Sequence, residues 1–104
     1  MNTLHIHVGE RIQDGTAVVT ISGDPIALPE VAPLRREISN LVNGGARTVV
    51  VDLSRVNHVG AAMLGELAMG VKTTRDAGGD LRLSGVSRRI RKVLTVTGLS
   101  RFFK

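Results

Sequence analysis

The fold of this chain is decided by Thr48-Val-Val-Val-Asp52, near the middle of the sequence. Its opening β-branched residues form a continuous apolar run, the pattern of a strand buried on both faces. Such strands occur in sheets with parallel neighbours, whose connections usually contain helices. We therefore expect helices on both sides of Thr48–Asp52 in the sequence.

Two apolar stripes at helical spacing flank this strand. Pro33 fits the first helix only in its first turn, and Gly44-Gly45 stops it. The second helix ends near Asp76-Ala-Gly-Gly79. The two stripes are Val31, Leu34, Ile38, Leu41 and Val42, and Met63, Leu64, Leu67, Ala68 and Val71.

Three further strands and one helix complete the predicted order. Leu4–Val8 and Ala17–Gly23 read as an antiparallel hairpin with a turn at Gln13-Asp14-Gly15. A short strand begins at Leu81, and a third helix runs from an N-cap at Ser87 to a stop at Gly98, with Ile90, Val93 and Leu94 inward. The sequence predicts a single α/β domain over residues 1–104, in the order β-β-α-β-α-β-α. Its sheet is mixed, with an opening hairpin and then parallel βαβ units.

Composition excludes several classes of protein. The 104 residues contain no Cys, Trp or Tyr, and the only two Phe are Phe102 and Phe103. Thiol chemistry and thiolate zinc sites are therefore excluded, and the core must be aliphatic. No apolar run approaches the ~18 residues of a membrane span and no signal peptide is visible, so a cytoplasmic protein is expected.

Several of these segments together resemble the STAS domain, which occurs in bacterial anti-sigma factor antagonists and in cytoplasmic domains of sulfate transporters. They are Val49–Val56, the helix after it, Gly78-Gly79 and Ile90–Leu99, and the resemblance extends from about Ala17 to Phe103. It implies a STAS-like fold and a role in bacterial signalling and regulation of transcription. It also implies that Asp52 belongs to a structural Asp-Leu-Ser turn. Because the family packs apolar residues after the Thr97-Gly-Leu99 stop, it implies further that Phe102 and Phe103 seal the lower edge of the core.

One segment departs from the family pattern. Anti-sigma factor antagonists usually read Asp-Ser-Ser-Gly or Asp-Ser-Thr-Gly after the central strand, and the hydroxyl there is phosphorylated. This chain has Gly60-Ala61-Ala62-Met63. Ala61 and Ala62 occupy the former phosphorylation positions and have no oxygen nucleophile, so we expect a domain locked in its unmodified state.

The resemblance implies a protein-binding surface at the start of the second helix and in the loop before it. Small residues and one flexible Met allow close approach of a partner. The alternative is that these residues are solvated or close-packed fillers, and that His58 is an ordinary loop histidine. The expected partner-binding residues are Asp24, Asn57, His58, Gly60, Ala61, Ala62, Gly65, Glu66 and Met69.

Positive charge is concentrated in the second half of the chain. Formal net charge is +5, and from Leu81 onward there are seven basic residues and no acidic one. Arg88, Arg89, Arg91 and Lys92 are interrupted by Ile90 and Val93 at helical spacing, so they form the solvent face of an amphipathic helix. That face is either simply solvated or contacts an acidic protein, anionic lipid or, least favoured, nucleic acid, because no aromatic residue interleaves with it.

Catalytic and metal-binding patterns are missing from the sequence. No Gly-x-Ser-x-Gly or phosphate-binding Gly-rich motif occurs. His5 and His7 share one strand face, but no further ligand stands at metal-binding spacing, so no metal is expected. No cofactor and no enzymatic activity are predicted.

Three functions remain open at this stage. The first is a regulatory interaction module that binds a kinase-type anti-sigma factor (a serine kinase) or scaffolds a complex without a phosphorylation switch. The second is the STAS subunit of a membrane lipid or anion ABC transport system, with an ATPase subunit as partner and only indirect membrane contact. The third is nucleic-acid binding through the basic helix. Because the family commonly continues beyond Thr97-Gly-Leu99, the fold is expected to be shortened at its C-terminus, and a homodimer through the exposed sheet edge is an alternative assembly.

Overall fold

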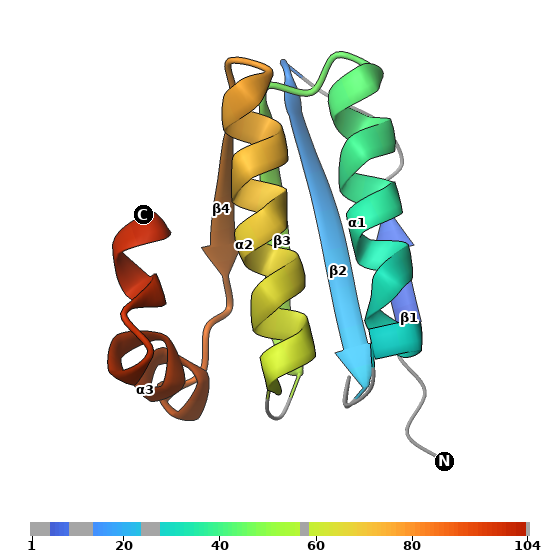
Figure 1. The fold of residues 1–104 in the computed structure, drawn as a ribbon. Helices are drawn as coiled ribbons and strands as arrows, with labels where there is room; N and C mark the ends of the chain where they lie inside the picture. The colour runs from blue at the N-terminus through green and yellow to red at the C-terminus, as the bar shows by residue number, and fades with distance from the viewer. Residues whose placement is uncertain (1–4, 9–13, 24–27, 57–58, 104) are drawn as a thin grey trace.

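The computed structural model describes residues 5–8, 14–23, 28–56 and 59–103, with side chains described for 14–22, 34–56 and 59–103. Its elements follow the predicted order (Figure 1). They are β1 (His5–Val8), β2 (Thr16–Gly23), α1 (Leu28–Asn43), β3 (Thr48–Val56), α2 (Ala61–Asp76), β4 (Asp80–Ser84), α3 (Arg88–Val96) and the 3₁₀ helix η1 (Leu99–Phe102).

The strands form one mixed sheet in the order β1-β2-β3-β4. β1 pairs with β2 antiparallel, whereas β2, β3 and β4 are parallel to one another. The opening hairpin and the parallel βαβ units are therefore confirmed. The turn before β2 includes Asp14 at φ 55° and Gly15 at φ 77°, a left-handed pair that Asp and Gly tolerate.

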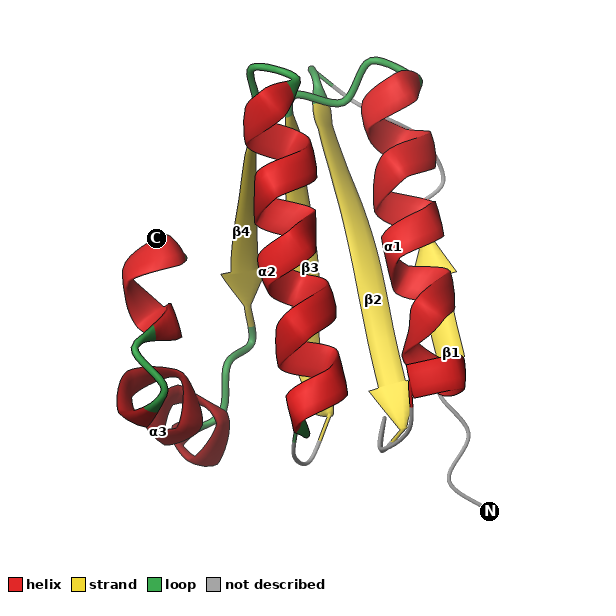
Figure 2. Cartoon of the chain, viewed as in Figure 1, coloured by secondary structure: helices red, strands yellow, loops and turns green. Residues whose placement is uncertain are grey.

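Both long helices cover the same face of the sheet (Figure 2). Each right-handed crossover steps in the same direction, from β2 to β3 and from β3 to β4, and so places its helix on the same side. Val49, Val51 and Leu53 face these helices and are 0% exposed, whereas Val50 on the other face is only half-buried. The prediction that this strand is buried on both faces is wrong for that reason.

An aliphatic core lies between the sheet and the helices. Ile21 of β2, Leu34 and Ile38 of α1, Leu67 of α2 and Leu81 of β4 are each 0% exposed. Most members of the two predicted apolar stripes therefore lie in the core or pack against it. Ala68 is half-buried, and the side chain of Val31 lies outside the described residues. None of the helices in the part of the chain that the structure describes is long and apolar enough to cross a bilayer.

The end of the chain is organised around α3. The Ser87 Oγ accepts a hydrogen bond from the Ile90 N–H at 3.1 Å, and Gly98 ends the helix at φ 77°, as predicted. Phe103 packs against the core. Phe102 remains 39% exposed, so the prediction that both Phe seal the core is correct for Phe103 and wrong for Phe102.

Candidate functional site

The start of α2 lies at the edge of the sheet where β3 ends (Figure 1). Gly60 is its N-cap in an extended conformation, and no side chain caps the helix. The first turn also has no acidic residue. Polar capping typically contributes ~1 kcal/mol to a helix, so α2 depends on its buried residues instead.

One accessible face of α2 carries two small residues and one flexible Met side chain. Ala61, Gly65 and Met69, at successive i, i+4 positions, are exposed, and Met69 is 42% exposed. A Cβ atom added at Gly65 would meet nothing within 4 Å. We call Ala61, Gly65 and Met69 the α2 face; it is open enough for another protein surface to approach its backbone. Ala62 is half-buried at its margin.

Glu66 was predicted to be on the partner-binding surface, but the structure shows it buried between α1 and α2. Its side chain is only 3% exposed. The Arg35 Nε and Nη2 atoms of α1 donate to its two carboxylate oxygens at 2.9 and 2.8 Å. Glu66 therefore holds α1 against α2 and is not available as a surface contact in this arrangement.

Arg35 is a residue that sequence reasoning missed. Glu66 shares one side of α2 with Gly70 and Thr74, which the structure shows to be buried as well. A Cβ atom at Gly70 would come within 2.8 Å of the Ile38 Cδ1 atom, so the two helices are closely packed there. An acidic side chain on such a side needs a cationic partner from the neighbouring helix.

The Asp-Leu-Ser segment makes a bulge near the end of β3. The register with β2 shifts between Thr20 and Ser22. The Ser54 N–H donates to the Asp52 Oδ1 atom at 2.9 Å, which pairs a backbone group at the irregularity. This bond, with the Ser54 side chain and the charge of Arg55 as smaller contributions, lowers the pKa of Asp52 below its usual 3.8. The geometry agrees with the structural role expected for Asp52.

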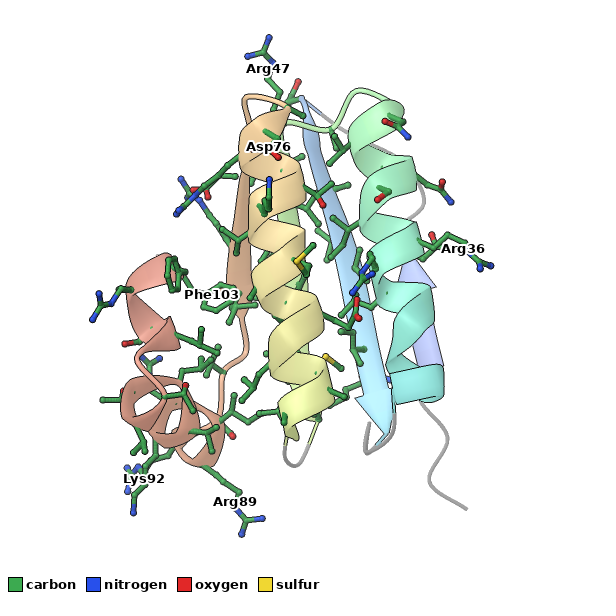
Figure 3. The ribbon with its side chains drawn as sticks, in the orientation of Figure 1. Arg36, Arg47, Asp76, Arg89, Lys92 and Phe103 are labelled. Atoms are coloured by element: carbon green, nitrogen blue, oxygen red, sulfur yellow. The ribbon has the colours of Figure 1, made fainter. Side chains whose placement is uncertain are left out.

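The basic residues of α3 form its exposed side. Ile90 and Leu94 are buried, whereas Arg88, Arg89, Arg91 and Lys92 are exposed. In Figure 3, Arg89 and Lys92 point away from the body of the molecule. The amphipathic pattern therefore placed these charges correctly on the surface.

Several predicted positions cannot be placed. Asp24, Asn57 and His58 lie outside the described residues, as do the side chains of His5 and His7. Of the predicted partner surface, the structure therefore describes the residues from Gly60 onward, and those that lie exposed on α2 are the three of the α2 face.

Comparison with known proteins identifies the family. Residues 8–104 match the family described as "Mlab, STAS domain". The chain belongs to this STAS-domain family. The resemblance seen in the sequence is thereby confirmed over almost the whole chain.

Solved structures of anti-sigma factor antagonists have the same fold as this STAS domain. One from Mycobacterium paratuberculosis is 25% identical with a TM-score of 0.80, over 97% of this chain and 83% of that one. SpoIIAA in its unphosphorylated form is 21% identical with a TM-score of 0.80, over 96% and 86%. The phosphorylated Bacillus SpoIIAA is 20% identical with a TM-score of 0.75, over 96% and 89%. Family and fold together support a regulatory protein-interaction role.

Proposed function

We propose that this STAS domain binds a regulatory protein partner through the α2 face and is not switched by phosphorylation there. The partner is a kinase-type anti-sigma factor, or a complex that the domain scaffolds. The domain acts in the bacterial cytoplasm, in regulation of transcription, as a binding module without catalysis of its own.

One observation carries the proposal. The helix that presents the accessible face begins with Ala61 and Ala62, and the sequence from Asn57 to Gly65 contains no hydroxyl side chain. SpoIIAA, which has a similar fold, is known in phosphorylated and unphosphorylated forms. A kinase partner therefore has no acceptor in this segment with which to release itself.

Affinity capture with and without ATP tests this function. The tagged protein is incubated with lysate of its source cell, next to a Gly65→Glu variant and an Arg36→Glu control. Gly65→Glu places a charge in open space on the α2 face, whereas Arg36 is exposed on α1. We expect one regulatory partner to be retained with ATP, lost with Gly65→Glu and kept with Arg36→Glu.

Phosphate on any residue from 57 to 65, or ATP-driven release with phosphate elsewhere on this chain, would contradict the proposal. A further variant, Ala61→Ser/Ala62→Ser, restores hydroxyls at the former phosphorylation positions. If the retained partner is a serine kinase, this variant should gain phosphate and dissociate when ATP is added.

A second candidate is the STAS subunit of a membrane lipid or anion ABC transport system. The exposed basic side of α3 favours it, because a subunit held near an anionic membrane surface gains from such charge. Retention of an ABC-type ATPase subunit instead of a sigma regulator would decide for this candidate.

A further inference from the structure

A hollow of about 220 Å³ lies where β4, α3 and η1 meet. Small-molecule sites usually have volumes of ~300–1,000 Å³, so this hollow is suited to a single side chain more than to a cofactor. Figure 3 shows Phe103 between η1 and β4 at this place. Its lining is Leu83, Val86, Arg91, Leu94, Ser100 and Phe103.

Exposed cations lie on the elements that form the hollow, and one of them, Arg91, lines it. Arg82, Arg88, Arg89, Arg91, Lys92 and Arg101 are all exposed. Within the described residues, the ion pairs are Arg35–Glu66, Lys72–Asp76 and Arg75–Asp80, and none involves these six cations. No acidic residue follows Asp80 in the sequence. The hollow therefore combines the apolar side chains of Leu83, Val86, Leu94 and Phe103 with positive charge that has no ion-pair partner among the described residues.

A second hollow, lined by residues of α2 and by Phe102 of η1, has its charged side chains paired. It has a volume of about 300 Å³ and is lined by residues that include Lys72, Arg75 and Asp76. Lys72 already pairs with Asp76 at 2.8 Å, and Arg75 lies 3.7 Å from Asp80. The cations at this second hollow already have acidic partners within the chain, so they do not favour binding of an acidic segment.

We propose that the hollow beside Arg91 is a docking site for an acidic protein segment that inserts one apolar side chain. The inserted side chain packs on Leu83, Leu94 and Phe103, and neighbouring carboxylates of the segment contact Arg91 and the other cations. Anchors of this kind, in a desolvated pocket with a charged rim, carry much of the energy of protein interfaces. The site is separate from the α2 face and does not rest on the function proposed for it.

Other anionic surfaces fit the same region less well. α3 has nine residues, and its one large exposed apolar side chain is Val96 at 76%, so it has little to insert into a bilayer. The phosphates of a nucleic acid would contact the cations, but a nucleic-acid backbone has no apolar group to place in the hollow. The charge and the hollow together favour an acidic protein segment.

Fluorescence polarisation with synthetic peptides tests the site on the full chain. The probes are a labelled acidic peptide with one central Leu, the same peptide with Ala at that position, and a Lys-rich version with the Leu kept. We expect the acidic Leu peptide to bind saturably, about tenfold more tightly than its Ala version, and the Lys-rich version not to bind. Binding should weaken as salt is raised.

Two variants distinguish the contribution of charge to peptide affinity from that of the inserted apolar side chain. Arg91→Glu should weaken the acidic Leu peptide about tenfold. Ser100→Phe fills the hollow and should abolish the difference between the Leu and Ala peptides, while salt-dependent binding remains. Arg36→Glu on α1 is the charge-matched control and should bind like the native chain. Circular dichroism verifies that each variant is folded.

Equal affinity for the Leu and Ala peptides, or no effect of either variant at the hollow, would overturn the proposal. The proposal would also be overturned if the protein bound phosphatidylglycerol vesicles or duplex DNA more tightly than the acidic peptide, and if that binding depended on Arg91.

Discussion

Arg35 of α1 and Glu66 of α2 form a bidentate ion pair in which the Glu66 side chain is 3% exposed and the Arg35 side chain 54% exposed. Glu66 follows Gly65 in the sequence but lies on the buried side of α2, where the pair joins α1 to the helix that presents the α2 face. The pair therefore fixes how the helix that presents this face sits on α1.

Removing one partner of this pair should destabilise the fold. Arg35→Ala leaves a buried carboxylate without its cation, and because water can enter where Arg35 was half exposed, we expect a loss of about 2–3 kcal/mol. The Arg35→Met/Glu66→Met double variant should lose less, because it buries no unpaired charge. Urea denaturation measures both.

The surface pair Lys72–Asp76 is the control for this experiment. Both of its side chains are 66% exposed, so Lys72→Ala should leave the urea midpoint almost unchanged. An equal loss from Lys72→Ala and Arg35→Ala would show that burial of Glu66 has no energetic role.

Asp52 should make the stability depend on pH in the acid range. Its pKa in the folded protein is lowered below 3.8, chiefly by the Ser54 N–H. A carboxyl whose pKa is lower in the folded than in the unfolded protein stabilises the fold fully when the pH is above its unfolded pKa. That stabilisation is lost as the pH falls through the folded pKa. Asp52→Asn keeps an oxygen acceptor for Ser54, so its urea midpoint should fall less than that of the native protein between about pH 6 and pH 3. Parallel curves for the two proteins would refute this assignment.

Alanine substitutions at Gly85 and Gly78 should distinguish the cost of backbone strain from the cost of steric contact. Both glycines have positive φ, 63° and 84°. A Cβ atom at Gly85 would lie 2.6 Å from the Ser54 Cβ atom, whereas one at Gly78 meets nothing within 4 Å. Gly78→Ala should cost about 1–2 kcal/mol from left-handed strain alone. Gly85→Ala should cost more, because the β3 bulge must also move.

Asn substitutions sharpen this comparison, since Asn tolerates the left-handed conformation. Gly78→Asn should recover most of the loss in urea denaturation, and Gly85→Asn should not. Similar recovery at both positions would mean that the contact with Ser54 does not constrain Gly85.

Gly65 should be replaceable without harm to the fold. It lies inside α2 with open space around its Cβ position, so Gly65→Ala should raise the free energy of unfolding by about 0.5–1 kcal/mol. Gly70→Ala is the matched control: its Cβ atom would lie 2.8 and 2.9 Å from the Ile38 and Leu81 Cδ1 atoms. Its gain should be smaller or negative because those core side chains must move. Equal gains, measured by urea denaturation, would contradict the close packing of α1 and α2 at Gly70.

Local patterns in the sequence predicted much of this protein. Periodicity placed Leu67 and Ile90 toward the core, capping chemistry placed Ser87 and Gly98 at the ends of α3, and the lack of hydroxyls at Ala61 and Ala62 is a property of the sequence alone. These features depend on residues a few positions apart, and helix or strand geometry converts such spacings directly into faces and ends.

Only the tertiary structure decided which faces are covered and which charges meet. Val50 is half-buried because both crossovers place their helices on one side of the sheet. Glu66 is buried because Arg35, 31 residues earlier in the chain, reaches it from α1. Arg91 lines a hollow because α3 and η1 fold back beside β4. Each outcome depends on contacts between distant segments, which are set by the packing of whole elements and not by the spacing of residues within one.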